Sequence, residues 1–267
     1  MSYWQNKVAI VTGGSAGLGR AIAAAFVARG AKVVIAARSA ETLAATAAEL
    51  RQSGGDALDV PTDVTRDADV RALISRTLER YGRIDVLVNN AGRSARGKAI
   101  ETSPEEFAAM TELNLVGLVR CTQAAMPHLL AVRGHLVNIG SLAGKTAARY
   151  MGAYSATKHA VSGYSAQLRR EMADQGLHVL LVSPGPIARD KPRDYSAEQT
   201  ASLPESARKP GGGVKTSLIR PERLAEQILT ACQRRKPELV VPGIARWIFA
   251  VSELWPGVGD WLVRKMS

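Results

Sequence analysis

Short runs of apolar residues alternate along most of the chain with longer segments in which apolar residues recur every three or four positions. The short runs are typical of buried strands, and the wider spacing is typical of one buried helix face. The clearest helical spacing links Val70, Leu73, Ile74, Thr77, Leu78 and Tyr81. Strands are expected at 8–11, 32–36, 57–61, 85–88, 134–141, 177–183 and 238–241.

Helix starts are marked as clearly as the strands. Ser103, Pro104 and Glu106 have the order of a capping box with proline at the first helical position, and Pro221 begins a later helix. The repeated strand–helix units predict an α/β fold, namely a Rossmann-type doubly wound parallel sheet with its ligand at the carboxyl ends of the strands. A chain of 267 residues can form this as a single domain, which we place at 1–243.

Composition narrows the class of protein. A hydrophobic content of 46% is ordinary for a globular protein, and no apolar run is long enough to span a bilayer. The first residues lead directly into a strand, so we expect no signal peptide. Cys121 and Cys232 show no motif spacing, which favours a reduced, cytoplasmic protein. The four histidines form no ligand-spaced cluster, so we expect no metal.

The formal net charge of +11 suggests a negatively charged binding partner. The basic residues are spread along the chain without an aromatic–basic motif, which argues against a nucleic-acid partner. Weak attraction to an anionic surface such as a membrane fits better. The alternative is a protein that is merely rich in arginine.

A glycine-rich turn follows the first predicted strand and opens the first predicted helix. It reads Thr12-Gly13-Gly14-Ser15-Ala16-Gly17-Leu18-Gly19. Glycines let the backbone approach a pyrophosphate closely, and the helix N-terminus offers N–H groups to the anion. The turn therefore predicts a dinucleotide site, although an ordinary tight turn is the alternative.

The second predicted strand ends without the carboxylate that typically binds the adenosine ribose in dinucleotide folds. Arg38 lies at that end instead, and its planar guanidinium suits a 2′-phosphate. This favours NADP(H), while NAD(H) remains an alternative cofactor. Arg38 can also be read as an ordinary surface arginine.

Tyr154 and Lys158 are four residues apart and so lie on one face of a predicted helix. An isolated phenol has a pKa near about 10 and is a poor acid–base catalyst at neutral pH. A fixed ammonium nearby favours the phenolate and lowers that pKa. Such a pair can pass a proton to or from a carbonyl or alcohol oxygen. On its own, the spacing also fits an ordinary helix.

The glycine-rich turn and the Tyr154/Lys158 pair belong to a longer series of motifs along the chain. They are Thr12-Gly13-x-x-x-Gly17-x-Gly19, Asp63-Val64, Asn89-Asn90-Ala91-Gly92, Asn114, Ser141, Tyr154-x-x-x-Lys158 and Pro184-Gly185. With this set, the chain resembles the short-chain dehydrogenase/reductase family over about residues 5–240.

The resemblance implies a catalytic tetrad of Asn114, Ser141, Tyr154 and Lys158. Ser141 would stabilise charge on the substrate oxygen, Tyr154 would exchange the proton, and Lys158 would also hold the nicotinamide ribose. Asn114 would position a water of the proton relay. The implied cofactor contacts are Gly13, Ser15, Gly17, Leu18, Gly19, Asp63, Val64, Asn90, Ala91, Gly92, Tyr154, Lys158, Pro184, Gly185 and Ile187.

Two positions depart from the family pattern. Arg189 stands where many members carry a threonine that binds the nicotinamide carboxamide. Ala16 stands where many NADP-using members carry a basic residue. The preference for NADP(H) therefore rests mainly on Arg38.

Two segments near the C-terminus suggest further roles. The long polar stretch 186–215 has the character of a substrate lid, or of a surface insertion. The segment 244–267 contains three of the four tryptophans, and Pro256 divides it into two short helical pieces. It suits a membrane surface, a subunit interface or a cap on the substrate pocket.

We therefore expect an NADP(H)-dependent enzyme that interconverts a ketone and a secondary alcohol on a lipophilic small molecule. An epimerase or dehydratase using the same tetrad is one alternative, and a non-catalytic NADP(H)-binding scaffold or sensor is another. The family resemblance also implies a homodimer or homotetramer.

Overall fold

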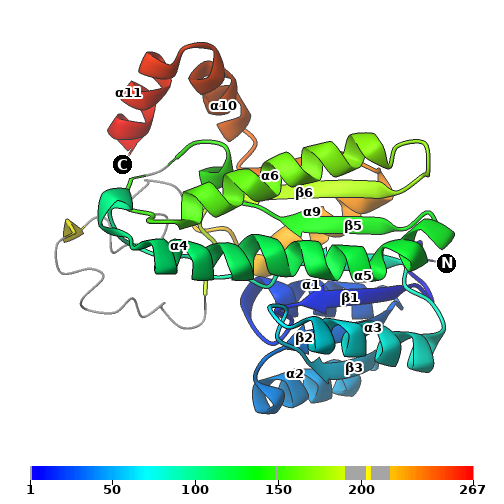
Figure 1. The fold of residues 1–267 in the computed structure, drawn as a ribbon. Helices are drawn as coiled ribbons and strands as arrows, with labels where there is room; N and C mark the ends of the chain where they lie inside the picture. Colours follow the sequence, from blue (N-terminus) through cyan, green and yellow to red (C-terminus); the bar gives the residue numbers. More distant parts are fainter. Residues whose placement is uncertain (1, 148, 190–202, 206–216, 267) are drawn as a thin grey trace.

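The computed structural model describes residues 2–147, 149–189, 203–205 and 217–266. Its centre is a seven-stranded parallel sheet with the strand order β3-β2-β1-β4-β5-β6-β7 (Figure 1). The strands are β1 (Val8–Thr12), β2 (Lys32–Ala37), β3 (Asp56–Pro61), β4 (Val86–Asn89), β5 (His135–Ile139), β6 (His178–Pro184) and β7 (Glu238–Val241). The predicted Rossmann-type sheet is confirmed, and all seven expected strands are present within two residues at either end.

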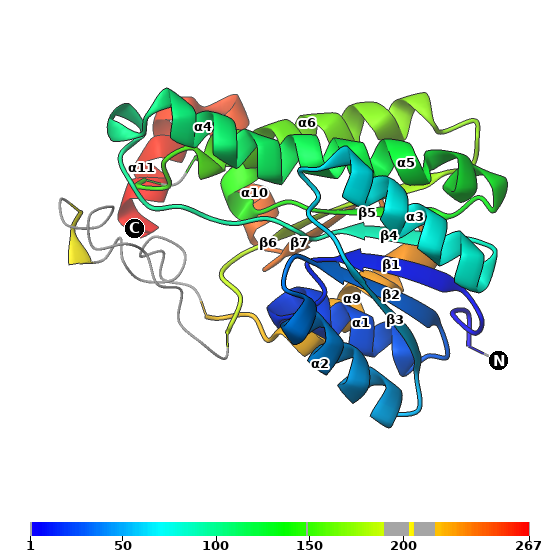
Figure 2. The same ribbon diagram turned by 60° about the horizontal axis from the view of Figure 1, so that its bottom comes forward.

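Helices cover both faces of the sheet (Figure 2). On one face lie α1 (Gly17–Val27), α2 (Ala40–Gln52) and α9 (Pro221–Gln233); on the other lie α3 (Asp67–Tyr81), α5 (Gly117–Ala131) and α6 (Tyr154–Glu171). Because both faces are covered, the central strands β1, β4 and β5 are buried along their whole length instead of alternating between buried and exposed residues. The helix α4 (Pro104–Thr111) begins with the predicted capping box between Ser103 and Glu106.

Each face has its own hydrophobic core, and each core holds one of the two cysteines. Cys232 lies with Trp4 and Phe26 in the core under α1 and α9, whereas Cys121 lies in the core under α3 and α5. Both thiols are free and buried. Burial raises the pKa of Cys121 to about 12 and also raises that of Cys232.

The strand order indicates where in the sheet the candidate site lies. From β1 the chain runs outward to β2 and β3, and it then returns to the other side of β1 with β4. Ligands of doubly wound sheets bind at the carboxyl ends of the strands where this reversal occurs. Here, the segments that follow β1 and β4 carry the glycine-rich turn and the Asn89-Asn90-Ala91-Gly92 motif.

A buried polar network lies at the opposite edge of the sheet, where His135 and His178 begin adjacent strands. Their Nδ1 atoms are 2.9 Å apart, and Nε2 of His178 lies 2.8 Å from the carbonyl oxygen of Lys236. A carbonyl only accepts, so Nε2 of His178 carries the proton and its Nδ1 accepts from Nδ1–H of His135. The Tyr3 hydroxyl then donates to Nε2 of His135 at 2.8 Å.

Cys232 completes a group that the sequence did not reveal. Its sulfur and one ring nitrogen of each histidine lie within 4.8 Å of one another. The two histidines are 43 residues apart in sequence and meet because β5 and β6 are paired in register. Since each ring nitrogen already has a hydrogen-bond partner, we interpret the group as a structural polar network.

In the part of the chain that the structure describes, we find no helix with the length and apolar character needed to cross a membrane.

We predict that the free energy of unfolding falls as the pH drops below about 6.5, the ordinary histidine pKa. Burial, followed by His178, Arg235 and Lys7, lowers the pKa of His135 to about 3, and burial also lowers that of His178. The unfolded chain therefore binds protons that the folded rings do not, so stability is full above pH 6.5 and declines toward pH 3. His135 alone contributes a slope of up to about 1.4 kcal/mol per pH unit, and His178 adds to it; urea unfolding over this range would measure the sum.

His135→Gln should reduce this slope even though it lowers stability at neutral pH. His128→Gln, which removes a histidine outside the network, is the matched control and should leave the slope unchanged. Equal slopes for His135→Gln and the unmodified protein would contradict the interpretation.

Candidate active site

The glycine-rich turn leaves the N-terminus of α1 open to an anion. Ala16, at the N-cap, makes no side-chain cap, and the first turn of α1 has no acidic residue. In contrast, Ser39 and Ser103 cap α2 and α4 with their side chains. The first N–H groups of α1 and the positive end of its dipole thus remain available for a phosphate.

Close backbone packing shapes this turn. Gly13 has a φ of +65°, which an L side chain rarely adopts. A Cβ on Gly19 would lie 2.1 Å from the carbonyl oxygen of Gly13 and 2.6 Å from Nδ2 of Asn90. Asn90 Nδ2 in turn donates to the carbonyl oxygens of Thr12 (2.9 Å) and Gly13 (3.2 Å). Gly13, Gly19 and Asn90, all predicted cofactor contacts, therefore pack directly against one another in the glycine-rich turn.

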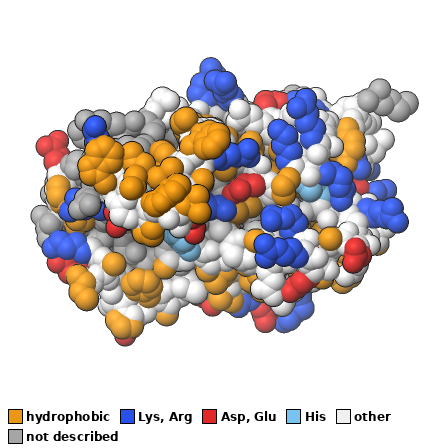
Figure 3. Space-filling view, turned by 90° about the horizontal axis from the view of Figure 1, so that it is seen from above, with side chains coloured by type: hydrophobic (Ala, Val, Ile, Leu, Met, Phe, Trp, Pro, Cys, Tyr) orange, Lys and Arg blue, Asp and Glu red, His pale blue; other side chains and the backbone are white. Residues whose placement is uncertain are grey.

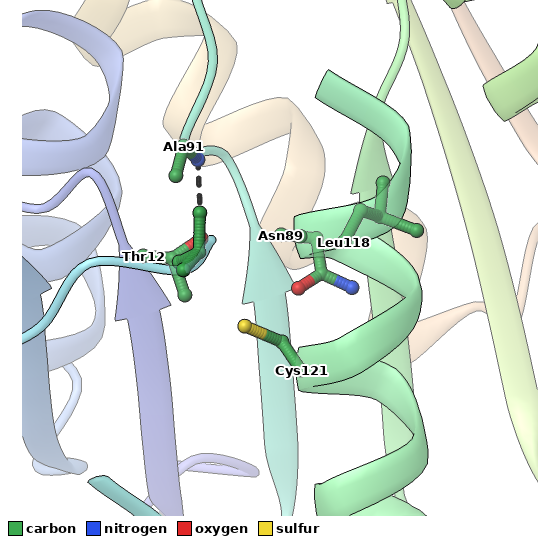
Figure 4. Close-up of a pocket in the computed structure, with 7 residues that line it drawn as sticks. Thr12, Asn89, Ala91, Leu118 and Cys121 are labelled. Carbon is green, nitrogen blue, oxygen red and sulfur yellow. Dashed lines mark hydrogen bonds between the residues drawn. The ribbon is translucent and has the colours of Figure 1, made fainter. Parts of the chain in front are cut away.

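Thr12 joins the ends of β1 and β4, a role that the sequence analysis did not assign. Its Oγ1 accepts from the backbone N–H groups of Asn90 (3.0 Å) and Ala91 (3.1 Å) and donates to the carbonyl of Val88 (3.2 Å). Figure 4 shows Ala91 directly above Thr12, beside a small recess. The recess is lined by Thr12, Val64, Asn89, Ala91, Gly117, Leu118 and Cys121.

Arg38 and Asp63 lie near each other beyond the ends of β2 and β3. Burial tends to raise the pKa of Asp63, but hydrogen bonds from Thr65 and the charges of Arg38 and Arg66 hold it below its ordinary value. Arg38 is exposed. The buried Val64 packs where α5 begins, since a Cβ on Gly117 would be 2.8 Å from its Cγ2. This arrangement offers a guanidinium and a carboxylate to the adenosine end of a dinucleotide.

Tyr154 and Lys158 lie in the first turns of α6, as their spacing predicts. The Lys158 side chain is buried, and its Nζ donates to the carbonyl oxygen of Ile139 at 2.7 Å. The same Nζ lies 5.9 Å from the centre of the Tyr154 ring. The end of β5 thus holds the ammonium beside the phenol.

Asn114 lies in a π-helical turn, Glu112–Val116, between α4 and α5. The local sequence does not distinguish this turn from an α-helix. Such turns are rare overall, but many of those known lie at functional sites. The buried Asn114 amide exchanges two hydrogen bonds of 2.9 Å with the backbone of Arg93 and donates to Thr157 Oγ1 at 3.1 Å. A Cβ on Gly92 would lie 2.9 Å from Asn114 Oδ1 and 4.0 Å from Lys158 Nζ.

Ser141 follows β5 and caps the short 3₁₀ helix η3 (Leu142–Gly144). Its Oγ accepts from the N–H of Ala143 at 3.1 Å, which leaves the hydroxyl hydrogen able to donate to a substrate oxygen. The 3₁₀ helix packs directly on α6, because a Cβ on Gly144 would lie 2.5 Å from the carbonyl oxygen of Lys158. Ser141 is therefore fixed relative to the turn that carries the tyrosine and lysine.

The segment after β6 continues along the same edge. The N–H of Gly185 donates to the carbonyl of Val241 at 2.7 Å, and Ile187 pairs with Ile219 in an isolated bridge. Arg189, where the family pattern has threonine, is exposed. The bridge ties both ends of the proposed lid together, while most of the lid, 190–202 and 206–215, falls outside the described residues.

The structure brings the predicted residues of the glycine turn, the β4 end, the π-helical turn and α6 to one edge of the sheet. It also shows a contact that the sequence did not indicate. Gly97 pairs with Met151, three residues before Tyr154, and the adjacent Arg96 is buried with its Nη1 3.1 Å from the Met151 sulfur. No local pattern marks this contact, because its partners are 55 residues apart.

The site therefore has the parts of an NAD(P)-binding oxidoreductase, and comparison with known proteins agrees. Residues 7–200 match the family model described as short chain dehydrogenase. A putative ketoacyl reductase of Streptomyces coelicolor is 33% identical over 98% of this chain and 100% of its own length. A 3-oxoacyl-[acyl-carrier-protein] reductase of Synechocystis is 39% identical over 72% of this chain and 78% of its own.

Solved structures show the same fold. A short-chain dehydrogenase/reductase from Burkholderia phymatum in complex with NAD has a TM-score of 0.80 and 28% identity, with 95% of this chain and 96% of that chain covered. A variant of actinorhodin polyketide ketoreductase with NADPH has a TM-score of 0.76 and 31% identity, with 91% and 98% covered. The chain belongs to the short-chain dehydrogenase/reductase family and is an NAD(P)-dependent oxidoreductase.

We predict that Gly19→Ala weakens nucleotide binding by about tenfold or more, because the added methyl meets the Gly13 carbonyl and displaces the turn from the pyrophosphate. Fluorescence titration with NADPH and with NADH would measure the loss, and circular dichroism would confirm that the variant is folded. Gly163→Ala on α6 is the control, since its Cβ would meet no atom within 4 Å. Binding by Gly19→Ala as tight as that of the control would contradict the prediction.

Proposed function

We propose that the protein is an NADP(H)-dependent oxidoreductase that interconverts a ketone and a secondary alcohol on a lipophilic small molecule. The observation that carries this proposal is the position of the Lys158 ammonium. It lies between the carbonyl of Ile139 and the Tyr154 ring and close to Gly92 and Asn114.

Each member of the tetrad can perform a distinct step. In reduction, the nicotinamide supplies the hydride that becomes the carbinol hydrogen. The Tyr154 hydroxyl donates its proton to the carbonyl oxygen, and the Lys158 ammonium favours the resulting phenolate. The Ser141 hydroxyl donates a hydrogen bond to the same oxygen and stabilises the charge that develops on it. Oxidation of the alcohol runs through these steps in reverse.

Asn114 links two segments of the site through its side-chain hydrogen bonds. Its amide nitrogen donates to the Arg93 carbonyl and to Thr157 Oγ1, and its Oδ1 accepts from the Arg93 N–H. Thr157 belongs to the same helical turn as Tyr154 and donates to the Tyr154 carbonyl at 2.8 Å. The amide thus joins the segment after β4 to the start of α6. Asn114 Oδ1 accepts one bond here and has a second lone pair, so it can also accept from a water, as the role implied by the family resemblance requires.

Arg38 supports NADP(H) over NAD(H). It is exposed at the end of β2 and close enough to Asp63 for its charge to affect that carboxyl. The end of β2 itself carries no acidic residue that would repel a 2′-phosphate, since the nearby Asp63 follows β3. A guanidinium binds phosphate through paired N–H groups.

Two observations support a lipophilic substrate. Similar chains are named as ketoacyl reductases, so β-ketoacyl esters are suitable first substrates. The C-terminal segment also exposes three tryptophans, Trp247, Trp255 and Trp261, at the edge of the molecule nearest the site.

We predict that Tyr154→Phe lowers turnover of any accepted ketone by a factor of about 10² to 10⁴, because the proton donor is lost. NADPH oxidation would be followed by absorbance with ketones that range from polar to lipophilic. Tyr164→Phe, on the same helix, is the matched control and should retain activity.

The same assay separates the rival functions. An epimerase or dehydratase would convert its substrate without net NADPH oxidation, and a scaffold would bind NADPH without converting any ketone. Full activity in Tyr154→Phe would overturn the assignment of the proton donor.

We predict that Arg38→Ala raises the KM for NADPH by about tenfold or more and leaves the KM for NADH nearly unchanged, because only the 2′-phosphate loses a partner. Steady-state kinetics with both cofactors would measure this. Arg76→Ala, at an exposed position of α3, is the control. If Arg38→Ala left both KM values unchanged, the preference for NADP(H) would not depend on this residue.

A further inference from the structure

Exposed apolar side chains are concentrated in the C-terminal segment. Among the described residues, nine large hydrophobic side chains are exposed, and six of them lie between 244 and 261, so the distribution is not that of scattered surface residues. We call these six the C-terminal apolar surface: Ile244, Trp247, Leu254, Trp255, Val258 and Trp261. Figure 3 shows hydrophobic side chains gathered on this face, with Lys and Arg side chains beside them.

Two short helices carry this surface. They are α10 (Ala245–Leu254) and α11 (Pro256–Met266), which form the pair that stands away from the sheet in Figure 1. The helices pack closely on each other, because a Cβ on Gly259 would lie 2.5 Å from Ser252 Oγ. Trp247 is 73% exposed even so, which shows that the pair does not cover its own largest side chains.

The helix pair leaves the sheet at the edge that carries the candidate site. β7 leads directly into α10, and the carbonyl of Val241 at the end of β7 accepts the N–H of Gly185. Gly185 also approaches Leu142, the neighbour of Ser141, since a Cβ there would lie 3.3 Å from Leu142 Cδ1. Whatever binds the helix pair is therefore held near the carboxyl ends of the strands.

We propose that the C-terminal apolar surface docks the protein on an anionic lipid surface. Tryptophan side chains prefer the boundary between lipid and water, and helices too short to span can lie in that boundary. Charges of both signs adjoin the surface: Lys265 Nζ lies 5.1 Å from the centre of the Trp261 ring and Arg246 is exposed next to Trp247 in sequence, while Glu253 and Asp260 are exposed on the same helices. The net charge of +11 attracts the whole molecule to anionic headgroups.

A second copy of the chain fits the surface less well. The cores of subunit interfaces are depleted of charge, whereas here Lys265 lies over the Trp261 ring. Two copies would also bring like charges of +11 together, which opposes association at low salt. The lipid surface is thus the partner whose charge is complementary.

Docking on a lipid surface would also bring the enzyme to its substrate, a consequence that rests on the proposed function. A lipophilic ketone partitions into the bilayer, so an enzyme held there by its active-site edge would meet its substrate at a high local concentration.

The test uses full-length protein and vesicles of phosphatidylcholine, with and without phosphatidylglycerol. We expect cosedimentation with the anionic vesicles that weakens as salt is added. Replacing Trp247, Trp255 and Trp261 together with serine should weaken binding on the order of tenfold or more, because each buried ring contributes to the affinity. Ile100→Ser, which removes a 91% exposed apolar side chain outside the C-terminal apolar surface, should bind like the unmodified protein.

Light scattering and kinetics complete the test. The triple variant should keep the oligomeric state of the parent and its activity on a water-soluble ketone without vesicles. No binding of the parent to anionic vesicles, or equal binding by the triple variant, would overturn the proposal. A change from oligomer to monomer in the triple variant would overturn it too, by identifying the surface as a subunit interface. Absent turnover in every protein, with vesicle binding intact, would count against the proposed function alone.

Discussion

Backbone contact at three glycines sets the geometry on which the rest of the site depends. Gly19 lets α1 approach the end of β1, Gly92 lets the segment after β4 approach Asn114, and Gly144 lets the short helix after β5 lie on α6. At these positions a Cβ would lie 2.1, 2.9 and 2.5 Å from its nearest neighbour, a distance that real side chains do not reach. Because interiors are close-packed, these contacts leave the phosphate turn, the amide and the serine little freedom to move relative to Lys158.

The candidate site combines preorganised charge with ordinary side-chain chemistry. A buried ammonium is costly unless it is hydrogen-bonded, and the Ile139 carbonyl supplies that bond to Lys158. This bond fixes the Lys158 Nζ 5.9 Å from the centre of the Tyr154 ring. The proposed chemistry uses the phenol, the serine hydroxyl and the lysine ammonium, and the nucleotide would supply the hydride.

The sequence was most informative where structure follows from local pattern. Strands covered on both faces are continuous apolar runs, and the residues of the Tyr154-x-x-x-Lys158 spacing share a helix face whatever surrounds them. Contacts between segments far apart in the sequence produce no local pattern that could predict them. The hydrogen bond between Asn114 and Thr157 joins residues 43 apart in the sequence. Asn114 makes it from a π-helical turn, which helix propensity does not predict. The pairing of His135 with His178 likewise follows from strand register and not from any motif.

The two cysteines have a consequence for how the protein responds to oxidants. Cys121 and Cys232 lie in different cores on opposite faces of the sheet, and burial keeps both in the thiol form, which is a weak nucleophile. They cannot pair with each other in the folded chain, and neither is open to glutathione or peroxide. The two thiols of the folded protein are thus insensitive to the surrounding redox poise, and a cysteine introduced on its surface would be the single site for thiol-directed labelling.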